Sequence, residues 1–132
     1  MFLNMLNEKE QKNFMELAAI AMSVDGKIEE SEKEVIDVYR REMNLHDYEI
    51  KNKEQKELIT AFQASTKKIK RAVIIELAGV LDADEIIDEN EENWIMKIGQ
   101  EWGFRASEIR RMVRWTQDFN YLLAEGYDII LK

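Results

Sequence analysis

The sequence has 132 residues, 45% of them hydrophobic and 35% charged, with a net charge of -8 and neither cysteine nor proline. We expect one domain over residues 1–132, because a chain of this length can bury its own core. The missing cysteines exclude disulfides and thiolate metal sites and suit a cytoplasmic protein. The negative charge disfavours nucleic acid and anionic lipid as partners. No apolar run approaches the roughly 20 residues of a membrane span.

Apolar residues recur at helical spacing along the first half of the chain. Asn7 and Glu10 have the spacing of a capping box, so a first helix is expected from residue 8 to the turn at Asp25-Gly26. A second helix is expected from about residue 29 or 31 to Met43. A third, mostly polar helix is expected over residues 51–65.

The second half continues the helical pattern. A strongly apolar helix is predicted over residues 66–81, and the next begins after Asp88 and ends at Gly103. Ser107 is predicted to cap a last helix that runs to Gly126, with residues 127–132 packed back as a short extension. Trp115 is expected in the core. No segment alternates with period two, so we predict an all-α fold, a compact bundle of six to seven helices.

The two halves of the chain repeat one pattern. Residues 16–20, Glu-Leu-Ala-Ala-Ile, match residues 76–80, Glu-Leu-Ala-Gly-Val, and an acidic turn follows each segment. The match covers about residues 7–45 and 67–104. It predicts an internal duplication of helical hairpins, and whether the two acidic turns meet in it is left open.

The acidic turns resemble the second half of an EF-hand calcium loop. In the first turn Asp25 falls at loop position 5, Gly26 at 6 and Glu32 at 12. Ala21 and Val80 stand where each loop needs its first carboxylate, and this departure argues against a genuine EF-hand. The two copies nevertheless place Asp25 and Glu32 in positions that match Asp84 and Glu91.

The alanine- and leucine-rich helix, the acidic turn of residues 24–32 and the second copy about 60 residues later resemble the tellurite-resistance TerB-like family. A similar domain is found at the N-terminal side of DnaJ-like membrane co-chaperones. The resemblance covers roughly residues 10–125 and implies a bundle of about seven helices in a stress- or tellurite-related context. It also implies a divalent-cation site, for calcium or magnesium, with four ligands: Asp25, Glu32, Asp84 and Glu91. Glu85 departs from the glycine expected in the second turn.

Two explanations of the acidic turns remain open besides metal binding. Carboxylates at Glu29, Glu32, Asp88 and Glu91 suit helix N-termini and need no ligand there. Alternatively, the domain is an acidic protein-interaction scaffold without metal. Two carboxylates roughly 5 Å apart repel by about 3 kcal/mol at an effective dielectric near 20, so converging turns require a cation or a basic partner.

Catalysis is not expected. The sequence has no glycine-rich phosphate loop and no nucleophile elbow. His46 is the only histidine, which leaves no zinc site of the usual type. Basic runs at residues 67–71 and 105–114 are interpreted as solvated helix faces.

Overall fold

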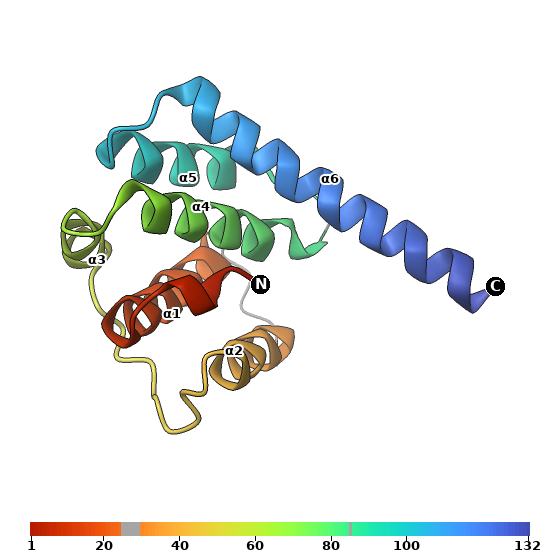
Figure 1. Ribbon diagram of the computed structural model, residues 1–132, viewed down its shortest axis with the longest axis horizontal. Helices are drawn as coiled ribbons and strands as arrows, with labels where there is room; N and C mark the ends of the chain where they lie inside the picture. Colours follow the sequence, from red (N-terminus) through yellow and green to blue (C-terminus); the bar gives the residue numbers. More distant parts are fainter. Residues whose placement is uncertain (25–29, 85) are drawn as a thin grey trace.

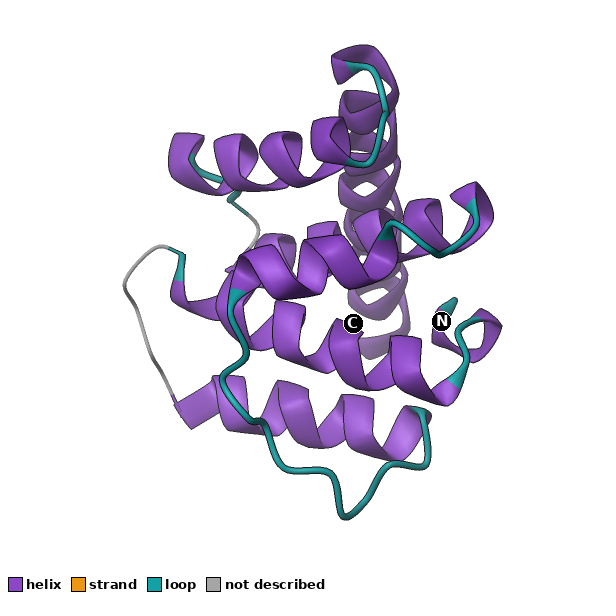
Figure 2. Cartoon of the chain, turned by 90° about the vertical axis from the view of Figure 1, so that its left-hand side faces the viewer, coloured by secondary structure: helices purple, strands orange, loops and turns teal. Residues whose placement is uncertain are grey.

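The computed structural model describes residues 1–24, 30–84 and 86–132, with the backbone alone for residues 30–32 and 84. Within these residues the chain forms six α-helices and two short 3-10 helices, and no strand (Figures 1 and 2). The predicted all-α class is therefore confirmed. None of the described helices has the length and apolar character needed to cross a bilayer.

Helix α4 lies at the centre of the bundle. It contacts α1, α5, α6 and the N-terminal turn η1 (Figure 1). Val73, Ile74, Leu77 and Ala78 are buried on several of its sides, which explains its strong apolar pattern in the sequence. The elements are η1 Leu3–Met5, α1 Glu8–Ser23, α2 Glu30–Glu42, α3 Gln55–Phe62, α4 Lys67–Leu81, η2 Asp82–Asp84, α5 Glu89–Glu101 and α6 Ala106–Leu131.

Helix starts and stops follow the local sequence at three predicted places. Asn7 Oδ1 accepts a hydrogen bond from the Glu10 amide at 2.8 Å, and Glu10 Oε1 accepts from the Asn7 amide at 2.9 Å. Asp88 and Glu91 form the same reciprocal pair at the start of α5. Gly103, with φ of 91°, follows the end of α5 in the left-handed conformation that glycine favours.

The predicted third helix was too long at its start. Helix α3 begins at Gln55, and residues 48–53 form a loop across α1. The Lys51 and Lys53 amides donate to the buried Glu16 carboxylate at 2.9 and 3.1 Å, and Asn52 between them has a positive φ of 55°. This backbone geometry is incompatible with a helix, so a tertiary contact overrides the local helical pattern.

Four predictions for the last helix were wrong. Helix α6 begins at Ala106, so Ser107 lies inside it, and it continues through Gly126 to Leu131. One glycine costs a helix only about 1 kcal/mol, which flanking helix formers offset. Residues 129–131 are 70–80% exposed and do not pack back, and Trp115 is 44% exposed where we expected it in the core.

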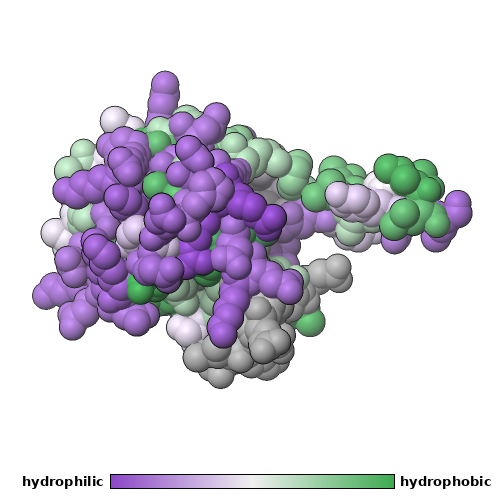
Figure 3. Space-filling model, turned by 90° about the horizontal axis from the view of Figure 1, so that it is seen from below, coloured by the Kyte–Doolittle hydropathy of each residue, from purple (hydrophilic) through white to green (hydrophobic). Residues whose placement is uncertain are grey.

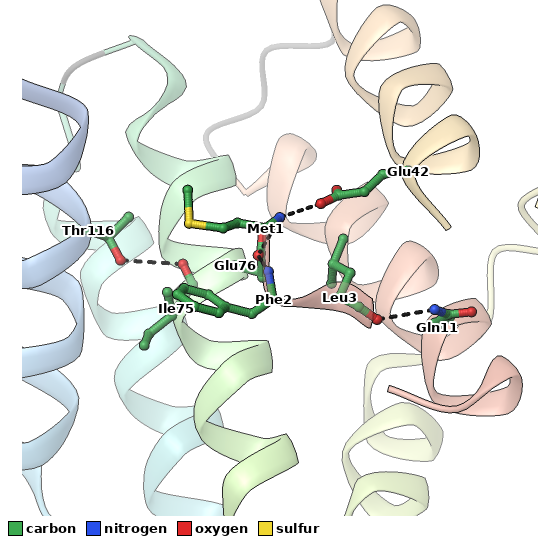
Figure 4. Close-up of polar contacts among 8 residues, drawn as sticks. All are labelled: Met1, Phe2, Leu3, Gln11, Glu42, Ile75, Glu76 and Thr116. Atoms are coloured by element: carbon green, nitrogen blue, oxygen red, sulfur yellow. Dashed lines mark hydrogen bonds and ion pairs between the residues drawn. The ribbon is translucent and has the colours of Figure 1, made fainter. Parts of the chain in front are cut away.

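The N-terminal segment packs into the angle between α1, α2 and α4 (Figure 4). Leu3 is buried, and its carbonyl accepts from Gln11 Nε2 at 3.1 Å. Glu76 Oε1 on α4 accepts from the Phe2 amide at 2.7 Å and lies 3.2 Å from the Met1 amine, which also pairs with Glu42. One carboxylate thus fixes where the chain enters the bundle.

Candidate functional site

The four predicted metal ligands fall largely outside what the structure describes. Asp25 lies outside the described residues, and only the backbone of Glu32 and Asp84 is described. Glu32 is the third residue of α2 and Glu91 the third residue of α5, so the predicted repeat places them at equivalent helical positions. The cation site of Asp25, Glu32, Asp84 and Glu91 stays a prediction.

Glu91 is the one predicted ligand whose side chain is described, and it takes part in helix capping. Its Oε1 accepts from the Asp88 amide at 3.1 Å, while Asp88 Oδ1 accepts from the Glu91 amide at 2.8 Å. The capping explanation is therefore confirmed for this pair. Among the described side chains, no three histidine, cysteine, aspartate or glutamate residues come together in a group that would hold a metal ion.

A crevice opens beside the second acidic turn, between the end of α4 and the outer part of α6. The two helices are in close contact at Gly79, where an added Cβ would lie 3.8 Å from Thr116 Cγ2. The Thr116 hydroxyl reinforces this contact, with its oxygen 3.4 Å from the Ile75 carbonyl on α4 (Figure 4). Beyond Thr116 the helices separate and leave a cavity of about 810 Å³.

Two elements supply the polar lining of this crevice. Asp82, at the C-terminal end of α4, is buried, and its Oδ2 accepts from Asn120 Nδ2 on α6 at 2.9 Å. That hydrogen bond fixes the carboxylate against α6. The remaining carboxylates come from α6, where they share one helical face: Asp118, Glu125 and Asp128.

The described residues that line the crevice carry charge of one sign. They include four carboxylates and no lysine, arginine or histidine. Carboxylates in a concave site with low-dielectric walls focus a negative potential. The C-terminal end of α4 adds the negative pole of its helix dipole at Asp82. The crevice therefore attracts positively charged groups.

The three α6 carboxylates were not recognised from the sequence, although their spacing held a signal. Residues 118, 125 and 128 stand at i, i+7 and i+10, which is one face of a helix. Because Trp115 was expected in the core and residues 127–132 were expected to pack back, the exposed polar face of this helix was overlooked.

Comparisons of the chain with protein-family models, curated proteins and solved structures found no match. No family is therefore assigned, and the TerB-like resemblance stays a prediction.

Proposed function

We propose that this chain is a non-enzymatic, TerB-like interaction module that binds a lysine- or arginine-rich segment of a partner protein in the crevice between α4 and α6. The observation that carries the proposal is the lining: four carboxylates from two elements with no cationic side chain among them. The net charge of -8 adds long-range attraction for such a partner.

The spread of the carboxylates favours an extended basic segment over a compact ion. Calcium takes six to eight oxygen ligands at about 2.3–2.6 Å, which requires several carboxylates to converge on one point. Asp82 lies on one wall and Asp118, Glu125 and Asp128 follow α6 along the other. Charges separated along a groove match side chains that are separated along a peptide.

The size and lining of the crevice suit binding rather than catalysis. Its volume of about 810 Å³ falls within the roughly 300–1,000 Å³ of ligand sites. Among the described residues of the lining there is no histidine, serine, threonine or cysteine from which a catalytic triad could be assembled. Exposed ion pairs contribute about 0.2–1 kcal/mol each, so four carboxylates supply selectivity for charge and modest affinity.

The test is binding of a fluorescent arginine- and lysine-rich peptide, with an acidic peptide of equal length for comparison. Asp82→Asn with Asp128→Asn removes two crevice charges and keeps an acceptor oxygen at each position. Glu34→Gln with Glu57→Gln is the matched control, because it changes net charge equally on exposed faces elsewhere. We expect the crevice variant to raise the dissociation constant about tenfold and the control by less than twofold. Equal losses in the two variants would show general charge attraction and overturn the proposal.

A metal titration separates the proposal from the cation hypothesis. Ligand at about 100 times its dissociation constant stabilises a folded protein by roughly 2.7 kcal/mol, which a melting curve detects readily. The proposed function predicts no change in melting temperature between millimolar calcium or magnesium and chelator. A rise that is lost in Glu91→Gln would favour the cation site over the peptide site.

A further inference from the structure

The outer part of α6 is an arm without support from the bundle. The inner part of the helix is packed, with Ile109 and Thr116 buried, whereas the end of the helix projects beyond the other elements (Figures 1 and 3). Eight large apolar side chains from Trp115 onward are 44–80% exposed. Large exposed apolar side chains gathered on one element mark an interaction site in a soluble protein.

Three of these exposed side chains share a stripe with coiled-coil spacing. Trp115, Leu122 and Ile129 alternate along it with the half-buried Phe119 and Gly126, at intervals of four, three, four and three residues. The Trp115 and Phe119 rings stack with their centroids 5.5 Å apart, and Phe2 supports Trp115 at 6.0 Å. The stripe therefore begins on a fixed aromatic platform and continues along the arm.

Charge changes sign along the same helix. The inner part carries the exposed Arg110, Arg111 and Arg114, and the outer part carries Asp118, Glu125 and Asp128. None of these six side chains has an ion-pair partner among the described residues. A parallel helix pair would set like charges together, whereas an antiparallel pair sets basic halves against acidic halves.

We propose that α6 pairs antiparallel with α6 of a second copy of this chain, so that the protein is a homodimer. Pairing that sets Arg111 beside Glu125 of the other chain also sets Trp115 against Phe119 and Met112 against Leu122 of that chain. In an antiparallel pair, residues that flank the apolar stripe on the same side of each helix face one another across the interface. Arg111 and Glu125 flank the stripe on the same side, so they can pair between the two chains. The interaction occurs twice by the two-fold symmetry.

The apolar contact of this pairing is centred on the two-fold axis, where Met112, Trp115, Phe119 and Leu122 of each chain meet. A covered aromatic residue buries about 150–250 Å², toward the roughly 600 Å² on each chain of a specific interface. Two carboxylates of the crevice, Asp118 and Glu125, lie at the edge of this interface. Asp128 lies by helical position on the side of α6 away from the stripe, so in the dimer a basic segment binds between Asp128 and Asp82.

Sedimentation equilibrium on the whole chain from about 1 to 200 µM tests the dimer. We expect twice the monomer mass in the wild type and a dissociation constant at least 30-fold higher in Leu122→Gln. Tyr121→Gln is the matched control, since Tyr121 is exposed to a similar extent, 71% against 64%, but lies off the stripe. We expect its dissociation constant within threefold of the wild type. A wild type that stays monomeric at 200 µM, including one that binds lipid vesicles instead, would overturn the proposal.

Charge exchange tests the orientation. Arg111→Glu and Glu125→Lys should each weaken the dimer about three- to tenfold, and the double variant should restore it. In this pairing the Asp118 carboxylates of the two chains lie beside each other and repel, so Asp118→Asn should strengthen the dimer.

A distance measurement also tests the orientation. Because the chain has no cysteine, a spin label at Leu131→Cys is unique. At a rise of 1.5 Å per residue, the two labels should lie roughly 40 Å apart. Labels near 10 Å would indicate a parallel pair and overturn the proposed orientation.

Discussion

Two glutamates, Glu16 on α1 and Glu76 on α4, hold two separate segments of the chain against the bundle with different chemistry. Glu16 is 1% exposed and accepts from the Tyr48 hydroxyl at 2.6 Å and from the Lys51 and Lys53 amides. Glu76 is half-buried and accepts from the Phe2 amide at 2.7 Å. Each carboxylate binds backbone amides of a segment that lies outside the α-helices.

The donors differ in charge. Glu16 has three neutral donors, so its charge is stabilised by fixed dipoles in a buried site. Lys12 and Lys51 add positive charge nearby, with ammonium groups 5.9 and 6.0 Å from the Tyr48 ring centroid. Glu76 instead shares the exposed Met1 amine with Glu42.

The comparison shows how one residue type at matching positions serves two different segments. Glu16 and Glu76 fall at the same place in the predicted repeat, which itself stays a prediction. The neutral, buried donor set makes Glu16 costly to replace, because every donor loses its acceptor at once. One of the two donors of Glu76, the Met1 amine, is exposed and has Glu42 as a second partner, so Glu76 is less costly to replace.

Glu16→Gln should have the largest effect. Glutamine keeps the side-chain volume but removes the negative charge. Its NH2 group replaces one acceptor oxygen, so a donor then faces the donors that Glu16 binds. Hydrogen bonds to charged groups contribute about 1.5–3 kcal/mol each, so we expect a loss of about 3 kcal/mol in the free energy of unfolding. Urea denaturation measures it.

Glu8→Gln is the control for this experiment, because it makes the same chemical change on the same helix. Glu8 is exposed and forms only an i,i+4 ion pair with Lys12 at 3.4 Å, so its loss should stay within about 0.5 kcal/mol. If Glu16→Gln were as mild as Glu8→Gln, the loop at residues 48–53 would not depend on the Glu16 carboxylate.

Glu76→Gln should have a smaller effect. Glutamine keeps an acceptor oxygen for the Phe2 amide, and the Met1 amine keeps Glu42. The substitution removes the ion pair between Glu76 and the Met1 amine. The Met1 side chain is 54% exposed, and exposed ion pairs contribute about 0–1 kcal/mol. We therefore expect a loss of about 1 kcal/mol or less by urea denaturation. A loss equal to that of Glu16→Gln would remove the distinction between the two anchors.

The local sequence was sufficient to predict those helix ends that depend on residues within one helical turn. Spacing predicted the capping boxes at Asn7 and Asp88 and the stop at Gly103, because each depends on residues within one turn. The loop at residues 48–53 was missed because Glu16 binds it from more than 30 residues away. The apolar end of α6 was assigned to the core because hydropathy does not show whether anything covers a helix face.

The candidate site was predictable only in part. The acidic turn after α4 directed attention to the right end of the bundle, and Asp82 there lines the crevice. Its other carboxylates come from α6, whose path past α4 is set by the contact of Gly79 with Thr116. The crevice therefore depends on tertiary packing, which spacing along one segment does not show.

The smallest expected effect is on the free energy of unfolding at alkaline pH. Each of the two glutamates raises the pKa of one tyrosine. Burial raises the pKa of Tyr48 above its ordinary value, with the hydrogen bond and charge of Glu16 adding to it. Burial also raises the pKa of Tyr39, with the charges of Glu76 and Glu42 adding to it. Both tyrosines are protonated in the folded and unfolded chain well below pH 10, so neither affects stability there.

As the pH rises through about 10, the unfolded chain loses these protons first, so the free energy of unfolding must fall. We expect Tyr39 and Tyr48 to form phenolate only as the chain unfolds, which ultraviolet difference spectra recorded alongside circular dichroism would show. Tyr48→Phe should remove part of the alkaline loss of stability, and Glu76→Gln should reduce the part due to Tyr39, because one of the charges that raise the pKa of Tyr39 is gone. An alkaline loss in Glu76→Gln equal to that of the wild type would show that the charge of Glu76 does not act on Tyr39.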